Sequence, residues 1–238
     1  MGLDLSASKE NLYALIKSNK YSVLLVIHYF GFCQNNMEEI SALCKEHGVV
    51  LIEDCAHTMF GYCSGVRLGS IGDFSIFSVH KILSVENGGI LQVNSSEYLD
   101  LINKVKLDGL YCDVLGEVLM SDLECVRSKR RDNYCALMNV LVEFDGIEMM
   151  YPDLPEGVSP HNMPIIIRRG RREEVYFKLI DLGIPVVALY YRMISAISAE
   201  VFKDSIYLSE NILNLPVHQD VDSDDVISVR EAFRKIYG

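Results

Sequence analysis

Two ionisable side chains, those of Lys81 and Asp54, lie in apolar stretches of the sequence. Lys81 follows "FSIFSVH" and comes shortly before the Gly88-Gly89 pair, and Asp54 ends the run "VVLIED". An ammonium group in apolar surroundings is costly unless it is paired, neutral or used in chemistry. A lysine that is removed from water loses proton affinity, and its neutral amine can form a Schiff base with a carbonyl group. Lys81 is therefore a candidate nucleophile.

Each of the two residues also has an ordinary explanation. An aspartate after a strand is often the N-cap of a helix, and a single lysine usually extends its charge to the surface. The pair is more informative than either residue alone. The chemistry of pyridoxal phosphate (PLP) needs a lysine for the imine and a carboxylate that keeps the pyridine nitrogen protonated. This chemistry requires that the fold bring Asp54 and Lys81 together.

The residues around Asp54 predict a β-α-β unit. Residues 22–29, "SVLLVIHY", are a continuous apolar run typical of a strand covered on both faces. The segment 35–48 has apolar residues at helical spacing and ends in Gly48, a plausible C′ residue. Because "VVLIED" follows as a second buried strand, the two strands must be parallel, with a right-handed crossover. Asp54 then lies at the carboxyl end of a parallel strand, where open α/β sheets bind ligands.

The elements around Lys81 continue this sheet. Residues 69–81, "GSIGDFSIFSVHK", predict a turn, a strand and a loop, and "GGILQVN" predicts a further strand. A lysine just past one strand and a carboxylate at the end of another converge on the same edge of the sheet. Glu53 precedes Asp54, and its side chain is expected to point to the opposite face of the strand.

The second half of the chain changes in character near residue 145. Residues 96–144 are helical in pattern, and the long segment 120–144 begins with Ser121 or Asp122 as its cap. After Gly146, short strands, a helix over about 171–182 and a last helix from Asp222 predict a small α+β layer. The predicted domains are therefore residues 1–145, a portion of a large α/β domain that carries Lys81, and residues 146–238, a small C-terminal domain.

The composition is that of an ordinary globular protein. The 238 residues are 50% hydrophobic and 23% charged, with a net charge of −11. Acids and bases are interspersed and no basic stripe is present, which argues against nucleic acid as a partner. No apolar run approaches the length of a membrane span.

The seven cysteines form no C-x-x-C pair, and no secretory signal is present. An odd number of scattered cysteines predicts reduced, mostly buried thiols in a cytoplasmic protein. The histidines show no H-x₃-H spacing, so no metal site is expected either.

A long ordered stretch makes the sequence recognisable. "HYFG", "IEDCAH" and "G-x-x-G-x-x-G-D-F-S-I-F-S", followed by the lysine and the Gly-Gly pair, resemble the DegT/StrS family of PLP-dependent sugar aminotransferases. "RRDNY", "PIIIRRGRREEVYFKLIDLGIP" and "LNLPVHQDVDSDDVISVREAF" resemble the C-terminal domain of that family. The resemblance implies the PLP-transferase fold of aspartate aminotransferase, with a parallel-rich central sheet.

The resemblance implies roles for four residues. Lys81 would form the Schiff base with PLP and then carry the proton between the sugar carbon and the cofactor. Asp54 would pair with the pyridine nitrogen, and His57 would lie beside the cofactor hydroxyl, unless it is an ordinary loop histidine. Ser78 would contact the cofactor phosphate, but two residues separate it from Lys81 where the commoner family pattern has four.

The resemblance also implies a missing N-terminal segment. Family members carry, before the first matched strand, a Gly/Ser/Thr loop that binds the phosphate at a helix N-terminus; only one predicted helix precedes that strand here. Two functions follow as alternatives. One is transfer of an amino group from an amino acid, glutamate being expected, to a nucleotide-linked keto-sugar by a homodimer. The other is an inactive, partner-binding remnant, or half of a split enzyme whose first half is a separate chain.

Overall fold

The computed structural model describes residues 2–104 and 114–238. Part of the helical pattern predicted over 96–144, together with Cys112, lies outside these residues. The contacts divide the chain into two compact units. The site unit comprises Ala7–Cys125 with Gly157–Ser159; the C-terminal unit comprises Val126–Glu156 and Pro160–Gly238 with the residues up to Ser6.

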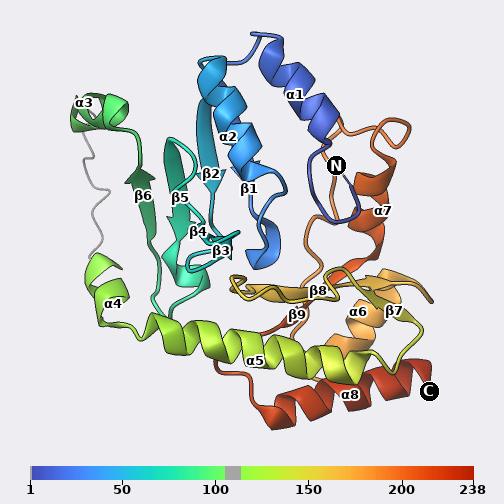
Figure 1. Cartoon of the computed structure of the whole chain (residues 1–238). Helices are drawn as coiled ribbons and strands as arrows, with labels where there is room; N and C mark the ends of the chain where they lie inside the picture. The colour runs from blue at the N-terminus through green and yellow to red at the C-terminus, as the bar shows by residue number, and fades with distance from the viewer. Residues whose placement is uncertain (1, 105–113) are drawn as a thin grey trace. The chain divides into compact units, whose positions relative to one another are not determined.

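A four-stranded sheet organises the site unit (Figure 1). Its strands, in spatial order, are β1 (Val23–Ile27), β2 (Val50–Asp54), β5 (Phe74–Ser78) and β6 (Gly89–Val93). β1, β2 and β5 are parallel, which confirms the predicted parallel pair. β6 runs antiparallel to β5, a direction that the sequence pattern did not predict.

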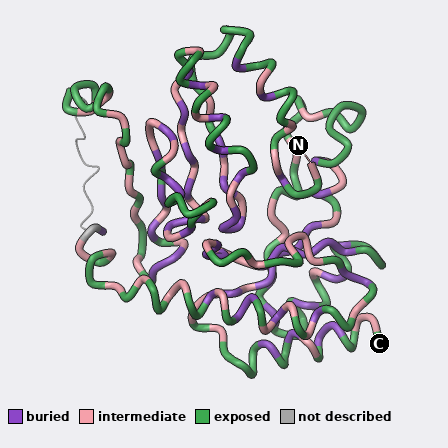
Figure 2. The backbone as a smooth tube through the Cα atoms, in the orientation of Figure 1, coloured by how far each residue is buried: buried purple, intermediate pink, exposed green. Residues whose placement is uncertain are grey.

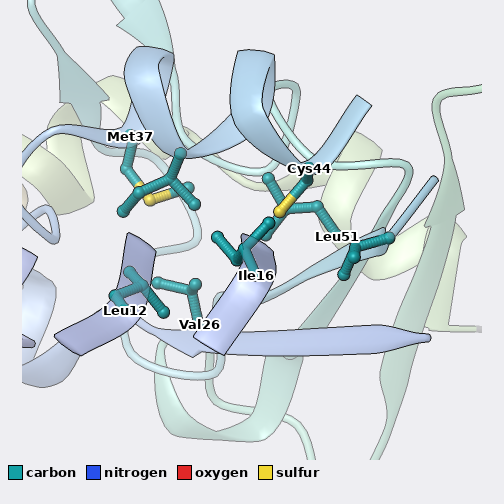
Figure 3. Packing of buried hydrophobic residues seen from close by; sticks show 8 residues of the cluster. Leu12, Ile16, Val26, Met37, Cys44 and Leu51 are labelled. Carbon is teal, nitrogen blue, oxygen red and sulfur yellow. The ribbon is translucent and has the colours of Figure 1, made fainter. Parts of the chain in front are cut away.

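Two helices cover one face of this sheet. They are α1 (Lys9–Lys17), capped by the Ser8 side chain, and α2 (Met37–Glu46), after which Gly48 adopts the left-handed conformation expected of a C′ residue. Figure 3 shows their buried side chains meeting those of Val26 and Leu51 from the strands. The two amphipathic helices thus bury one side of the β-α-β unit.

The opposite face of the sheet keeps apolar side chains exposed. The strand register aligns Leu25 with Ile52 and Ile76 with both Asp54 and Leu91, so these side chains share one face. The exposed apolar members of that face are Val23 (51%), Leu25 (52%), Ile76 (44%) and Leu91 (52%). These four residues are called the open face below.

A glycine-rich turn leads into β5 and is held by a buried carboxylate. Glu53 is fully buried, on the side of β2 opposite to Asp54, as predicted. Its oxygens accept hydrogen bonds from the backbone N–H groups of Gly69, Ile71 and Gly72 at 3.0, 2.7 and 2.6 Å. The small hairpin of β3 (Tyr62–Cys63) and β4 (Val66–Arg67) precedes this turn. Glu53 is thus a structural acid of the fold.

The remaining elements of the site unit follow β6. They are the short helices α3 (Leu99–Lys104) and α4 (Val114–Met120) and the first residues of α5 (Leu123–Leu141). Asp122 accepts a hydrogen bond from the N–H of Cys125 at 3.0 Å, so Asp122 is the cap of α5.

The C-terminal unit is an antiparallel three-stranded sheet with helices. Its strands are β7 (Ile147–Met149), β8 (Asn162–Ile167) and β9 (Ile212–Pro216), and its helices are most of α5, α6 (Arg172–Asp181), α7 (Lys203–Asn211) and α8 (Ser223–Tyr237). Asp222 and Asp225 form a capping box at the start of α8, and Figure 2 shows buried and exposed positions alternating along this helix. The α+β layer is confirmed; the boundary near residue 145 stays a prediction and lies between α5 and β7.

The cysteines differ from the expectation of reduced, mostly buried thiols. Cys33 and Cys63 form a disulfide, with a Cα–Cα distance of 5.8 Å. Cys44 and Cys55 are buried free thiols, as expected, whereas Cys125 and Cys135 are free and exposed. The spacing along the chain could not show this pairing, because the loop between β1 and α2 meets the β3–β4 hairpin only in the folded chain.

None of the described helices is both long and apolar enough to span a bilayer.

Candidate functional site

Asp54 lies at the carboxyl end of β2, between the ends of its parallel neighbours β1 and β5. Its Oδ1 accepts a hydrogen bond from the N–H of Ala56 at 3.0 Å, and a turn follows the strand, so Asp54 is not a helix N-cap. Among the described residues, no group donates a hydrogen bond to Oδ2. This carboxylate therefore keeps an acceptor available for a ligand at the sheet edge.

Lys81 ends a short 3₁₀-helix, Val79–Lys81, directly after β5. Its side chain is half-buried, less than the apolar sequence around it suggests. Lys81 Nζ lies 3.4 Å from Nε2 of His57. The structure therefore brings Lys81 to His57, which follows β2, across neighbouring strands of the sheet.

His57 contacts the amine of Lys81 and lies within the electrostatic influence of Asp54. Burial, and after it the positive charge of Lys81, lower the pKa of this imidazole, whereas the negative charge of Asp54 raises it. The resulting pKa is about 4. His57 is therefore neutral at physiological pH. Its Nδ1 accepts a hydrogen bond from the N–H of Phe30 at 3.4 Å.

The residues after β1 form one wall of the site. Phe30 is fully buried with φ of 57°, and its ring stacks on His57 with 6.1 Å between ring centroids. Tyr29 lies close enough for Asp54 to act on it: burial first, and then the negative charge of Asp54, raise the pKa of its phenol. The sequence contained a signal for this wall in "HYFG", but the left-handed backbone of Phe30 is visible only in the structure.

Ser78 ends β5 on the same face of the sheet as Asp54, because Ile76 is the register partner of Asp54. Its hydroxyl makes no hydrogen bond to any described residue. Ser78 thus lies at the same edge of the sheet as Asp54, and its role toward a phosphate stays a prediction.

A buried trio behind the site resembles a metal centre in composition. Ligand atoms of His28, Glu53 and Cys55 lie within 4.8 Å of one another. However, His28 Nδ1 accepts from the N–H of Gln34, and His28 Nε2 lies 3.1 Å from Glu53 Oε2. Burial alone would raise the pKa of Glu53, but the hydrogen bonds from His28 and the glycine-rich turn hold it below its usual value. These atoms therefore already serve the fold.

Comparisons with known proteins show what the chain is similar to. The model of the DegT/DnrJ/EryC1/StrS aminotransferase family matches residues 4–114. GDP-perosamine synthase of Vibrio cholerae is 31% identical over 141 residues, which cover 58% of this chain and 37% of that protein. Residues 4–114, which the family model matches, include β1 to β6 and thus all four candidate residues.

Solved structures extend the likeness to the whole chain. PseC of Helicobacter pylori, an aminotransferase involved in the biosynthesis of pseudoaminic acid, superposes with a TM-score of 0.79 at 18% identity, over 100% of this chain and 72% of that one. E coli GDP-4-keto-6-deoxy-D-mannose-3-dehydratase, solved with bound hydrated PLP, gives 0.67 at 18% identity, over 93% and 70%. These likenesses confirm the expected PLP-transferase fold, and residues 4–114 are similar to the DegT/DnrJ/EryC1/StrS aminotransferase family.

Proposed function

We propose that this protein is a PLP-dependent aminotransferase that transfers an amino group from an amino acid, glutamate being the expected donor, to a nucleotide-linked keto-sugar. The observation that carries the proposal is the placement of Lys81, His57 and Asp54 just at or after the carboxyl ends of the parallel strands β2 and β5. The family match to this segment supports the aminotransferase reaction. The relative named GDP-perosamine synthase supports a nucleotide sugar as substrate.

The residues at this edge fit PLP. A primary amine beside a neutral imidazole can react with an aldehyde, and a carboxylate with an available oxygen can hold the proton of a pyridine nitrogen. Lys81 and His57 supply the first requirement, and Asp54 supplies the second. When bound, PLP supplies the electron sink that stabilises a carbanion at the substrate carbon. Lys81, His57, Asp54 and Ser78 are thus the proposed cofactor-binding residues.

Each side chain has a separate task in the proposed reaction. Lys81 would hold the cofactor through its amine and would serve as the general acid–base at the substrate carbon. His57 holds the amine of Lys81 in place, because its own position is fixed by the N–H and the ring of Phe30. Asp54 would pair with the pyridine nitrogen from a strand end that is paired on both sides.

The first test is cofactor binding by the purified chain. We expect a visible absorption band when PLP is added, and borohydride reduction should attach the cofactor to the peptide that contains Lys81. Lys81→Ala should abolish the band and the attachment. Lys20→Ala, at an exposed position before β1, is the matched control and should retain both. A chain that shows no band at saturating PLP would contradict the proposal.

The open face favours the alternative of an incomplete enzyme. Val23, Leu25, Ile76 and Leu91 are exposed on the face that also carries Asp54. The chain spans 37% of the Vibrio relative and about 70% of the two solved chains. We propose that another polypeptide surface covers this face, by homodimer formation or by a separate chain. If PLP binds only when a second polypeptide of the family is added, the result supports the split enzyme. If PLP binds under neither condition, the result supports the partner-binding remnant.

The cytoplasmic location expected from the sequence is part of this proposal.

A further inference from the structure

A disulfide lies next to the proposed site and is not explained by it. Cys33 follows β1 in the loop that carries Phe30, and Cys63 ends β3. Their sulfur atoms are joined across a sequence separation of 30 residues. The chain segment that this bond closes contains both Asp54 and His57. Two of the three residues of the proposed site therefore lie within the covalent loop that this disulfide closes.

The loop of Cys33 reaches His57 by direct contacts. Phe30, shortly before Cys33, donates its N–H to His57 Nδ1 and stacks its ring on the imidazole. Phe32 is buried, and its N–H bonds the carbonyl of Tyr29 at 2.9 Å, which keeps the loop compact. Any change in the freedom of this loop is thus transmitted to His57.

The hairpin of Cys63 follows the turn that carries His57. In this turn the N–H of Gly61 bonds the carbonyl of Thr58 at 3.2 Å, and the N–H of Thr58 bonds the carbonyl of Cys55 at 3.0 Å. The disulfide therefore joins the loop that contacts His57 to the segment that continues from the His57 turn.

The two cysteines are also distinguished by access. Both are half-buried, within reach of small thiols. Cys44 and Cys55 are fully buried, and burial raises the pKa of their thiols to about 11 and about 12. Buried thiols of this kind are unreactive. In a cytoplasmic protein, moreover, a disulfide is usually transient and redox-sensing rather than structural.

We propose that Cys33 and Cys63 are a reversible redox-modification site whose oxidation fixes the Phe30 loop against His57. The oxidant that reacts with the two protein thiols is a small-molecule disulfide of the glutathione class. One protein thiolate attacks a sulfur of that disulfide and releases one thiol; the second protein thiolate then attacks the mixed disulfide and releases the other. Two electrons pass from the protein to the glutathione pair, and the two protons end on the two released thiols.

The test uses the whole chain without cofactor, so that it does not depend on PLP binding. The protein is equilibrated with oxidised or reduced glutathione, free thiols are blocked, and peptides are mapped by mass spectrometry. We expect a linked Cys33–Cys63 peptide in the oxidised sample and none in the reduced one. Hydrogen exchange at the amide of Phe30 should slow at least several-fold on oxidation.

Two variants control this experiment. Cys33→Ser should abolish both the linked peptide and the change at Phe30, whereas Cys135→Ser, which removes an exposed free thiol of the C-terminal unit, should leave both unchanged. Absence of the linked peptide under oxidised glutathione would overturn the redox site, and equal exchange at Phe30 in both states would overturn its coupling to His57. The effect on the site rests on the proposed function, and that function fails separately if no PLP–Lys81 adduct forms.

Discussion

His57 is the side chain whose surroundings are least ordinary. It lies between an ammonium and a carboxylate, its Nδ1 accepts from the backbone, and its ring stacks on Phe30. Its low pKa, about 4, follows first from burial and then from the charge of Lys81. The same shift that keeps the imidazole neutral for its proposed role also makes the folded state sensitive to acid.

The pH dependence of stability therefore has a predictable sign at this residue. Because the folded-state pKa lies below the unfolded value of 6.5, the unfolded chain takes up a proton first as the pH falls. Relative to His57→Gln, the wild type should lose on the order of 2–3 kcal/mol of unfolding free energy between about pH 6.5 and pH 4. Urea unfolding at pH 7.5 and pH 4.5 measures this difference. Ser78→Ala, a non-titrating change at the same edge, should follow the wild type; a wild type that tracks His57→Gln would refute the assignment.

At the scale of elements, the glycine-rich turn shows how the fold positions the site. The turn is held by Glu53, which points away from Asp54 on the same strand, and it leads directly into β5 and Lys81. Gly69, inside this turn, has φ of +89°, and a Cβ there would lie 2.3 Å from Cζ of Phe77. Gly48, after α2, has φ of +66° with no atom within 4 Å of a Cβ.

These two glycines give a matched pair of substitutions. Gly48→Ala should destabilise by about 1 kcal/mol, because only the left-handed backbone is penalised. Gly69→Ala should add roughly 1–3 kcal/mol of overpacking against Phe77 to a similar backbone penalty. Urea unfolding of both variants beside the wild type provides the comparison. Equal losses for the two would mean that Phe77 moves aside freely and that the turn is not tightly packed.

At the scale of the whole molecule, the open face is the feature that calls for a partner surface. A sheet whose second face exposes Val23, Leu25, Ile76 and Leu91 presents a larger apolar area than isolated surface residues would. The edge strands β1 and β6 each lack a strand partner on their outer side within the described part of the chain. Self-association is the expected consequence for the purified chain.

Sedimentation velocity tests this expectation. The wild type should sediment as a dimer or larger species, and a charge on the open face, Leu25→Asp, should shift it toward monomer. Leu119→Asp, at a position that is 75% exposed on α4 and outside the open face, should keep the wild-type behaviour. A wild type that remains monomeric at high micromolar concentration would contradict the need for a covering surface.

Much of the fold and of the candidate site was predictable, because it depends on local pattern. Apolar runs and helical spacing indicated β1, α2 and β2, and chain connectivity then required the first two strands to be parallel. The expectation that Asp54 and Lys81 lie at one edge of the sheet rested on a further strand before Lys81. The start of the last helix at Asp222 and the choice of Ser121 or Asp122 as the cap of the long helix were equally local, since a cap depends on the first turn alone.

The tertiary structure decided what depends on contacts between distant segments. No local sequence pattern indicates three of its features. These are the antiparallel direction of β6, the left-handed backbone of Phe30, and the position of His57 between Phe30 and Lys81. The Cys33–Cys63 pairing overturned the expectation of reduced thiols for the same reason. The sequence by itself determined which residues could do the chemistry and at which edge of the sheet. Only the folded chain decided how they are held and which sheet face stays open, because burial and pairing are set by neighbours far away in the sequence.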